Sequence, residues 1–282
     1  MMADKRVAII TGASSGMGEA LLRDLASKGW HVAMADLNTN DTLSSELGRN
    51  ASFHKTDVAD YDSQAKMFQE VWNEHGRIDA LLANAGIVDK ESLYIFDHRD
   101  SDVIPPKPSL LCTDIDWKGV IYGTQLATHF MRKNKVPGGT IVATGSVAAL
   151  YPHETYPEYD GAKAAVVNFV RATSRVLKIK ENIRINVVLP GILATSIIPP
   201  EMVAAVSPEC MTPISSIVAA YNTFLEDDTL SGQAIECSAE KRLFVPAMEP
   251  LNGHVSKRAV TVWEPLFKMY HHEGSGLPDA IE

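Results

Sequence analysis

The chain has 282 residues, 45% of them hydrophobic, and a formal net charge of −9 at pH 7. This length permits a large domain with a sizeable core. The acidic balance argues against nucleic acid or an anionic membrane as the main partner, and no run approaches the roughly 18 apolar residues of a membrane span. Three scattered cysteines indicate neither a disulfide framework nor a metal site. We expect a cytoplasmic protein.

Short apolar runs alternate along the chain with longer segments of helical period. The first such helix is expected over residues 16–29, where Leu21, Leu22 and Leu25 share a face and Gly29 follows the end. The apolar runs are continuous, which is typical of strands buried on both faces of a parallel sheet. They cover residues 6–10, 31–35, 78–83, 140–145 and 184–189. This order predicts an α/β fold, a doubly wound parallel sheet (Rossmann fold), as one domain over residues 1–282.

Three segments depart from this alternation. Residues 89–110 are charged and contain prolines, which indicates a surface loop. Residues 191–213 are rich in Pro, Ala and Ile without a clean period, and we expect a mobile substrate lid there. A helix capped by Thr212 should follow the lid. The C-terminal extension, about 240–282, carries no strong signal.

The stretch TGASSGMG, residues 11–18, follows the first predicted strand and opens the first predicted helix. Gly12, Gly16 and Gly18 allow a tight turn and close backbone approach. The exposed N–H groups and the helix dipole then form an anion site suited to a pyrophosphate. Because the turn lies between a strand and a helix, it predicts nucleotide binding.

An acidic residue, Asp36, follows the second predicted strand. Its carboxylate can accept hydrogen bonds from the adenosine ribose hydroxyls and would repel a 2′-phosphate. Leu37 stands where a cation would be useful for NADP. The alternative is that Asp36 only caps a loop. The pattern favours NAD as the cofactor.

Tyr159 precedes Lys163 by four residues, and Ser146 lies thirteen residues before the tyrosine. A helix starting near Tyr156 would put the tyrosine and the lysine on one face. Use of a tyrosine as a base near neutrality requires its pKa to fall by about three units, roughly 4 kcal/mol. A cation at about 5 Å contributes roughly 3 kcal/mol of this. Lys163 should therefore nearly suffice, while Ser146 donates to the substrate oxygen.

These motifs resemble those of the short-chain dehydrogenase/reductase family over about residues 6–195. The matching stretches are TGASSGMG, Asp57-Val58, ANAG at 83–86, Ser146, the Tyr159/Lys163 pair and PGILAT at 190–195. The resemblance implies that Tyr159 is the general acid/base and that Ser146 stabilises the alkoxide during hydride transfer. It also implies a homodimer or homotetramer that packs through helices near 114–132 and 157–178.

The residue patterns and the resemblance together predict one site. The catalytic candidates are Ser146, Tyr159, Lys163 and Asp116. The cofactor-binding candidates are Gly12, Ser14, Ser15, Gly16, Met17, Asp36, Leu37, Asp57, Val58, Asn84, Ala85, Gly86, Tyr159, Lys163, Pro190, Gly191, Leu193 and Thr195.

Two features depart from the family pattern. The family usually places an asparagine where IDWKG, residues 115–119, has Asp116. An ionised carboxylate there opposes a tyrosinate, so we expect Asp116 to be protonated, to pair with Lys163, or to raise the pH optimum. The second departure is SGQAIECSAEKRLFV, which stands where the family usually ends in GxxxxVDGG. This end resembles the 15-hydroxyprostaglandin dehydrogenase-like branch and its fungal relatives of secondary metabolism.

The leading functional hypothesis is an NAD-dependent enzyme that interconverts a secondary alcohol and a ketone. The lid, together with Tyr94, Phe96 and Tyr151, suggests a bulky apolar substrate such as a terpenoid, polyketide, steroid or lipid alcohol. Two alternatives stay open. One is a catalytically silent NAD(H)-binding sensor, which only Asp116 favours; the other is an NADPH-dependent ketone reductase, which Asp36 disfavours.

Overall fold

A single twisted sheet forms the centre of the molecule. In the computed structural model, which describes residues 5–195 and 197–282, eight strands take the order β3-β2-β1-β4-β5-β6-β7-β8. All neighbours pair in parallel except β7 and β8, which are antiparallel. The strands are β1 (Val7–Thr11), β2 (His31–Asp36), β3 (Ala51–Lys55), β4 (Ala80–Ala83), β5 (Gly139–Thr144), β6 (Ile183–Pro190), β7 (Ala234–Ser238) and β8 (Lys241–Phe244). The predicted doubly wound sheet is confirmed.

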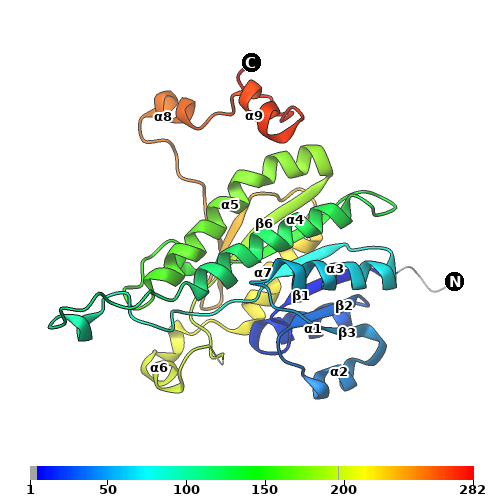
Figure 1. Cartoon of the computed structure of the whole chain (residues 1–282). Helices are drawn as coiled ribbons and strands as arrows, with labels where there is room; N and C mark the ends of the chain where they lie inside the picture. The colour runs from blue at the N-terminus through cyan, green and yellow to red at the C-terminus, as the bar shows by residue number, and fades with distance from the viewer. Residues whose placement is uncertain (1–4, 196) are drawn as a thin grey trace.

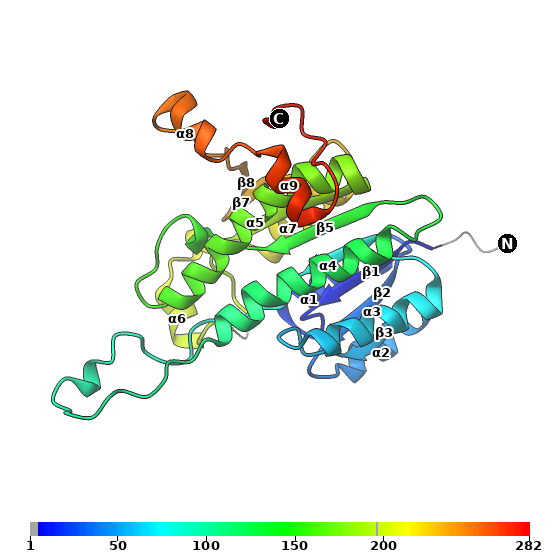
Figure 2. The ribbon, with the colours of Figure 1, turned by 45° about the horizontal axis from the view of Figure 1, so that its top comes forward.

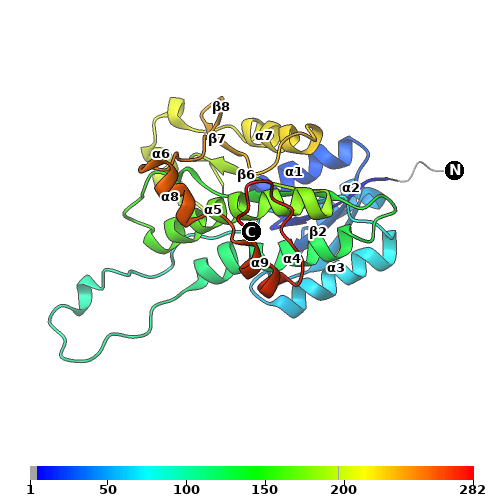
Figure 3. The same cartoon turned by 90° about the horizontal axis from the view of Figure 1, so that it is seen from above.

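Helices cover both faces of the sheet, which lies between them when seen from above (Figure 3). One layer holds α3 (Tyr61–His75), α4 (Gly119–Met131) and α5 (Pro157–Glu181), and the other holds α1 (Gly16–Ser27) and α7 (Ile214–Glu226). The shorter helices are α2 (Asp41–Leu47), α6 (Pro200–Ala205), α8 (Gly253–Ala259) and α9 (Glu264–His271). None of the helices in the described part of the chain is long and apolar enough to span a membrane.

The sheet side chains alternate between two separate cores, which explains the continuous apolar runs. Val7 and Ile9 face the core beneath α3, α4 and α5, whereas Ala8 and Ile10 face the core beneath α1 and α7. Each of these four residues is at most 1% exposed. Burial on both faces removes the polar positions that a half-exposed strand would need.

The edges of the sheet are less apolar than its centre. The side chains of β3 are only partly buried and those of β8 are exposed. Neither strand therefore produces a continuous apolar run.

The predicted cap of α7 is wrong: Pro213 is the capping residue, while the hydroxyl of Thr212 donates to the carbonyl of Cys237 at 3.3 Å.

Two segments project from the sheet and its helical layers (Figures 1 and 2). One is the loop that joins β4 to α4, which contains a short 3-10 turn, Phe96–His98. Its base is closed where the Glu91 carboxylate accepts a hydrogen bond from the Ser109 N–H at 3.2 Å. The other is the C-terminal segment that carries α8 and α9. Asp279 and Glu273 of this segment form ion pairs with Arg175 and Lys180 of α5.

Candidate active site

Two adjoining cavities open at the carboxyl edge of the parallel strands. The strand order reverses between β1 and β4, and open α/β sheets bind ligands at such a point. One cavity contains the catalytic candidates and the other contains Asp36 and the glycine turn. Both are lined by Met17, Asn84, Gly86, Ile87, Thr195 and Ile197. A long ligand can therefore extend from one cavity into the other.

The glycine turn packs backbone against backbone. Gly12 has a φ of +65°, and a Cβ there would lie 2.9 Å from Cα of Ala85. A Cβ on Gly18 would lie only 2.0 Å from the carbonyl oxygen of Gly12. Side chains at these positions would collide with main-chain atoms, so the sequence requires glycine. The turn thereby brings the start of α1 to the cavity wall.

The carboxylate of Asp36 is fixed at the end of β2. It accepts hydrogen bonds from the Ser14 N–H and the Asn38 N–H, both at 3.0 Å. Asp36 and Leu37 line the cavity, and no lysine or arginine is among the described residues around it. Ser14 does not line either cavity; its hydroxyl donates to the carbonyl of Asn38 at 2.6 Å.

Residues after β3 and β4 complete this cavity. Asp57, Val58 and Ala85 all line it. Asn84 joins β4 to β1, since its side-chain amide donates to the Thr11 carbonyl at 3.0 Å. The predicted residues that line at least one of the two cavities are Gly12, Ser15, Gly16, Met17, Asp36, Leu37, Asp57, Val58, Asn84, Ala85, Gly86, Tyr159, Lys163, Pro190, Gly191, Leu193 and Thr195.

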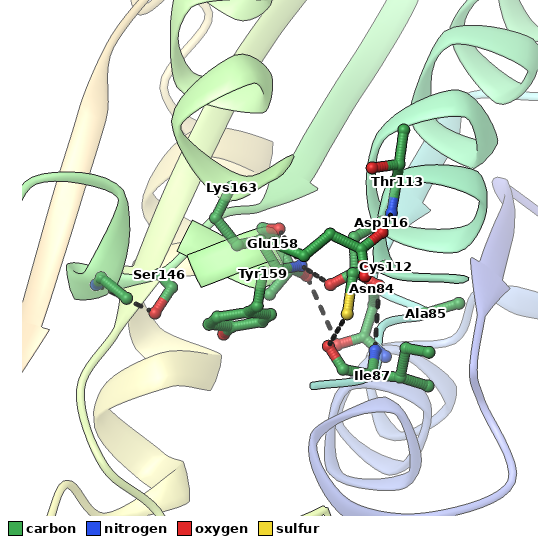
Figure 4. A network of polar contacts seen from close by, with 12 residues as sticks. Asn84, Ala85, Ile87, Cys112, Thr113, Asp116, Ser146, Glu158, Tyr159 and Lys163 are labelled. Atoms are coloured by element: carbon green, nitrogen blue, oxygen red, sulfur yellow. Dashed lines mark hydrogen bonds and ion pairs between the residues drawn. The ribbon is translucent and has the colours of Figure 1, made fainter. Parts of the chain in front are cut away.

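The first turns of α5 place Tyr159 and Lys163 in the other cavity. The Lys163 ammonium lies 5.6 Å from the centroid of the Tyr159 ring and donates to the Thr144 carbonyl at 2.9 Å. Ser146 follows the end of β5, and Figure 4 shows it beside the Tyr159 phenol. Its hydroxyl accepts a hydrogen bond from the Ala148 N–H at 3.1 Å. The structure thus gathers the three side chains at one wall.

Asp116 lies in a π-helical turn, Thr113–Lys118, that precedes α4. Its side chain is fully buried. One carboxylate oxygen accepts from the Ile87 N–H at 2.9 Å, and the other lies 3.1 Å from the Lys163 ammonium (Figure 4). Of the three outcomes considered for Asp116, the geometry therefore favours pairing with Lys163.

The charges around Tyr159 oppose one another. Burial of the phenol raises the pKa of Tyr159 above its usual value. Lys163 and the Ser146 hydroxyl act to lower this pKa, whereas Asp116 and Asp160 act to raise it. The prediction that Lys163 nearly suffices to bring the tyrosine pKa to neutrality is therefore wrong, because it left out the burial of the phenol.

The paired groups also affect each other. Burial acts to lower the pKa of Lys163, but the neighbouring Asp116 and Tyr159 outweigh it and the net pKa is raised. The lysine therefore stays protonated at neutral pH. Burial raises the pKa of Asp116, and the positive charge of Lys163 partly offsets this effect.

Part of the cavity lining comes from the predicted lid segment, which contains α6. Ser196 lies outside the described residues. The apolar residues of the cavity include Ile87, Val88, Val147, Ile192, Leu193, Ile198 and Met202. His153 and Tyr156 add polar groups to this lining. The cavity is therefore apolar around a small polar centre.

The three aromatic residues expected to contact substrate do not line this cavity. Tyr94 and Phe96 stack on each other in the projecting loop, with ring centroids 5.4 Å apart. Tyr151 is 60% exposed, and its hydroxyl bonds to Glu236 at 3.1 Å. The expectation was wrong because it assigned these aromatic residues to the site from their residue type alone, whereas the path of the loops places them outside the cavity.

Two contributions were missed in the sequence. Thr144 acts through its backbone carbonyl, which no side-chain pattern reveals. Asp89 was placed in the surface loop, yet its carboxylate accepts from the backbone N–H of Tyr159 at 2.8 Å. The available signal was an acidic residue three places after the ANAG motif.

The comparisons with known proteins agree with this geometry. The sequence profile of the short-chain dehydrogenases matches residues 6–202. The chain belongs to the short-chain dehydrogenase family. Short-chain dehydrogenase/reductase prx6 of Penicillium rubens is 52% identical, over 99% of this chain and 98% of its own. The NAD(+) 15-hydroxyprostaglandin dehydrogenase of Rattus norvegicus is 26% identical, over 86% of this chain and 94% of its own.

A solved structure resembles most of this dehydrogenase. A short-chain type dehydrogenase/reductase from Mycobacterium marinum aligns with a TM-score of 0.73 at 26% identity, covering 83% of this chain and 94% of its own. The family assignment identifies an oxidoreductase that uses a nicotinamide cofactor. The predicted family is thus confirmed.

Proposed function

We propose that this dehydrogenase interconverts a secondary alcohol and a ketone on a bulky apolar substrate, with NAD as the cofactor. The observation that carries the proposal is the position of Tyr159 in an apolar cavity that adjoins the cavity of Asp36. Ser146 and Lys163 lie in the same cavity as the tyrosine.

The residues fit a dinucleotide. A Cβ at Gly18 would lie 2.0 Å from the Gly12 carbonyl oxygen, so the glycine turn is tight, and the N–H groups at the start of α1 would bind the pyrophosphate. Asp57 and Val58 would border the adenine at one end. Leu193 and Thr195 would hold the carboxamide at the other end. When bound, the nicotinamide group supplies hydride transfer and, in its oxidised form, a positive charge.

Tyr159, Ser146 and Lys163 would each have a separate task in the catalytic cavity. The phenolate oxygen of Tyr159 would accept the proton of the substrate hydroxyl during oxidation and return it during reduction. The Ser146 hydroxyl would donate a hydrogen bond to the same substrate oxygen. Lys163, held cationic by Asp116, favours the phenolate. The apolar wall excludes water from the reacting carbon.

The preference for NAD rests on the environment of Asp36. Its carboxylate is oriented by two backbone N–H groups and has no cationic side chain among the described residues of its cavity. A 2′-phosphate would meet uncompensated negative charge there. The name of the rat relative specifies NAD(+), which points the same way. A homodimer or homotetramer packed through α4 and α5 completes the proposal and can be tested by analytical ultracentrifugation.

A calorimetric titration of the purified protein with NADH and then with NADPH tests the cofactor. We expect micromolar binding of NADH and at least tenfold weaker binding of NADPH. Apolar secondary alcohols are then assayed with NAD⁺ by NADH absorbance. Binding of NADH without turnover of any alcohol or ketone in a broad panel would favour the sensor hypothesis. Absence of binding by either nucleotide would contradict the enzyme assignment.

A further inference from the structure

Asp89 caps the helix that carries the catalytic tyrosine. One of its carboxylate oxygens accepts from the Tyr159 N–H at 2.8 Å, and the other accepts from the Glu158 N–H at 3.1 Å. The local capping residue of α5, Tyr156, provides no side-chain hydrogen bond. Pro157, the first helical residue, has no N–H to offer. Asp89 therefore satisfies both of the donors that follow it, from about 70 residues away in sequence.

Glu158 performs the same task for the neighbouring helix. Its carboxylate accepts from the Thr113 N–H at 2.8 Å (Figure 4). Thr113 begins the π-helical turn that contains Asp116, the partner of Lys163. The two carboxylates thus link the segment after β4, the π-helical turn and α5 in series. Each joins a backbone N–H of one segment to a side chain of another.

A buried thiol completes the cluster. The Cys112 Sγ lies 3.7 Å from an Asp89 carboxylate oxygen and 3.9 Å from the Ile87 carbonyl. Burial raises the pKa of the Cys112 thiol, and Asp116 raises it further, so the thiol remains protonated and can donate. The Asp89, Cys112 and Glu158 side chains are of types that also bind cations, but here both carboxylates accept hydrogen bonds from backbone N–H groups.

We propose that Asp89 and Glu158 are positioning residues that hold Tyr159 and Asp116 in register across the catalytic cavity. Neither carboxylate lines the two cavities, so neither touches substrate or cofactor. They act through the backbone. A displacement of about 1 Å in a catalytic group can lower a rate on the order of a hundredfold. This inference rests on the proposed function for its kinetic test but not for its structural one.

The kinetic test compares truncating and conservative variants of the full chain. Asp89→Ala and Glu158→Ala should lower kcat on the order of 10- to 100-fold, with KM for the alcohol and NADH affinity within about threefold of wild type. Asp89→Asn keeps one acceptor for two donors, and its kcat should lie between those of Asp89→Ala and the wild type. Glu158→Gln keeps the acceptor for the Thr113 N–H and should restore most of the activity.

A matched control separates positioning from general stability. Asp60 caps α3 by accepting from the Asp62 N–H at 3.2 Å, far from the catalytic residues in sequence. Asp60→Ala should lose about as much stability as Asp89→Ala, without a change in kcat. An equal loss of kcat in Asp60→Ala and Asp89→Ala, or a Glu158→Gln variant as impaired as Glu158→Ala, would overturn the proposal.

Amide hydrogen exchange tests the same idea without any substrate. In Asp89→Ala, exchange at the amides of Glu158 and Tyr159 should accelerate at least tenfold; in Glu158→Ala the acceleration should occur at Thr113. Asp60→Ala should change neither. Unchanged exchange at these amides would refute the positioning role. If the wild type showed no turnover while the variants showed this exchange pattern, only the proposed function would be contradicted.

Discussion

The cofactor cavity and the catalytic cavity adjoin but are built differently. In the cofactor cavity, the decisive contacts are between backbone groups, or between a side chain and a backbone N–H or carbonyl group. Asp36, for example, accepts from Ser14 and Asn38. In the catalytic cavity, buried charges from separate segments face one another, as in the pair of Lys163 with Asp116.

This difference has consequences for how each part tolerates change. A backbone cradle fails when atoms are added to it, since main-chain groups have no room to move. A set of buried charges responds when one member is removed, since each charge shifts the pKa values of the others. Substitutions should therefore act on binding in the first cavity and on proton transfer in the second.

The strongest test of this separation is Tyr159→Phe. Loss of the phenolic proton acceptor should lower kcat about a thousandfold. NADH affinity, measured by calorimetry, should stay within about threefold, because the cofactor cavity is intact. Substantial remaining turnover would show that another group carries the proton.

Gly18→Ala should instead act on the cofactor cavity, by lowering stability and weakening NADH binding. Its Cβ would lie 2.0 Å from the Gly12 carbonyl oxygen, so the turn has to shift, at a cost of about 3 kcal/mol or more in the free energy of unfolding. Denaturant unfolding and NADH titration measure both effects. Gly161→Ala is the control: in α5, a Cβ at Gly161 would meet no atom within 4 Å beyond the local helix backbone, so this variant should gain about 0.5–1 kcal/mol. Similar stability for the two variants would contradict the close backbone packing of the glycine turn.

Asp36→Ala sharpens the comparison within the cofactor cavity. We expect NADH affinity to fall about tenfold, or about 1.4 kcal/mol, while NADPH affinity stays the same or improves. Asp41→Ala removes an exposed carboxylate from the first turn of α2 and serves as the control for charge alone. An equal loss of affinity for NADH and NADPH would show that Asp36 only supports the turn.

Asp116→Asn should produce the smallest change in rate and the clearest change in pH dependence. The Asp116 carboxylate acts to raise the pKa of Tyr159. Alcohol oxidation requires the phenolate, so its rate in the wild type should rise toward alkaline pH. Removal of the carboxylate should move this rise to lower pH and keep or increase activity near neutrality. A hundredfold loss would instead show that Lys163 requires its partner.

The sequence predicted those parts of the molecule that depend on neighbouring residues. Continuous apolar runs identified the central strands because burial on both faces leaves no polar positions, and the glycine spacing located the turn at α1. The edge strands β3 and β8 were not among the apolar runs, since partial exposure admits polar residues.

The sequence predicted which polar residues meet in the catalytic cavity, but not how burial and charge combine to set the pKa of Tyr159. The spacing of Tyr159 and Lys163 follows from helix geometry, so it could be read directly. The burial of the phenol and the cap from Asp89 depend on segments that meet only in the folded chain. The projecting aromatic residues Tyr94 and Phe96 were misplaced for the same reason.

The projecting loop between β4 and α4 also affects how the chain can be cut and extended. Its outer part exposes backbone and large side chains such as Ile104, which is 88% exposed. Proteases prefer such segments, and insertions are tolerated there when the base of the loop remains closed. Because β4 and β5 pair directly in the sheet, the two fragments of a chain nicked near Ile104 should remain associated. The loop is therefore a suitable place for an epitope or a fluorescent label.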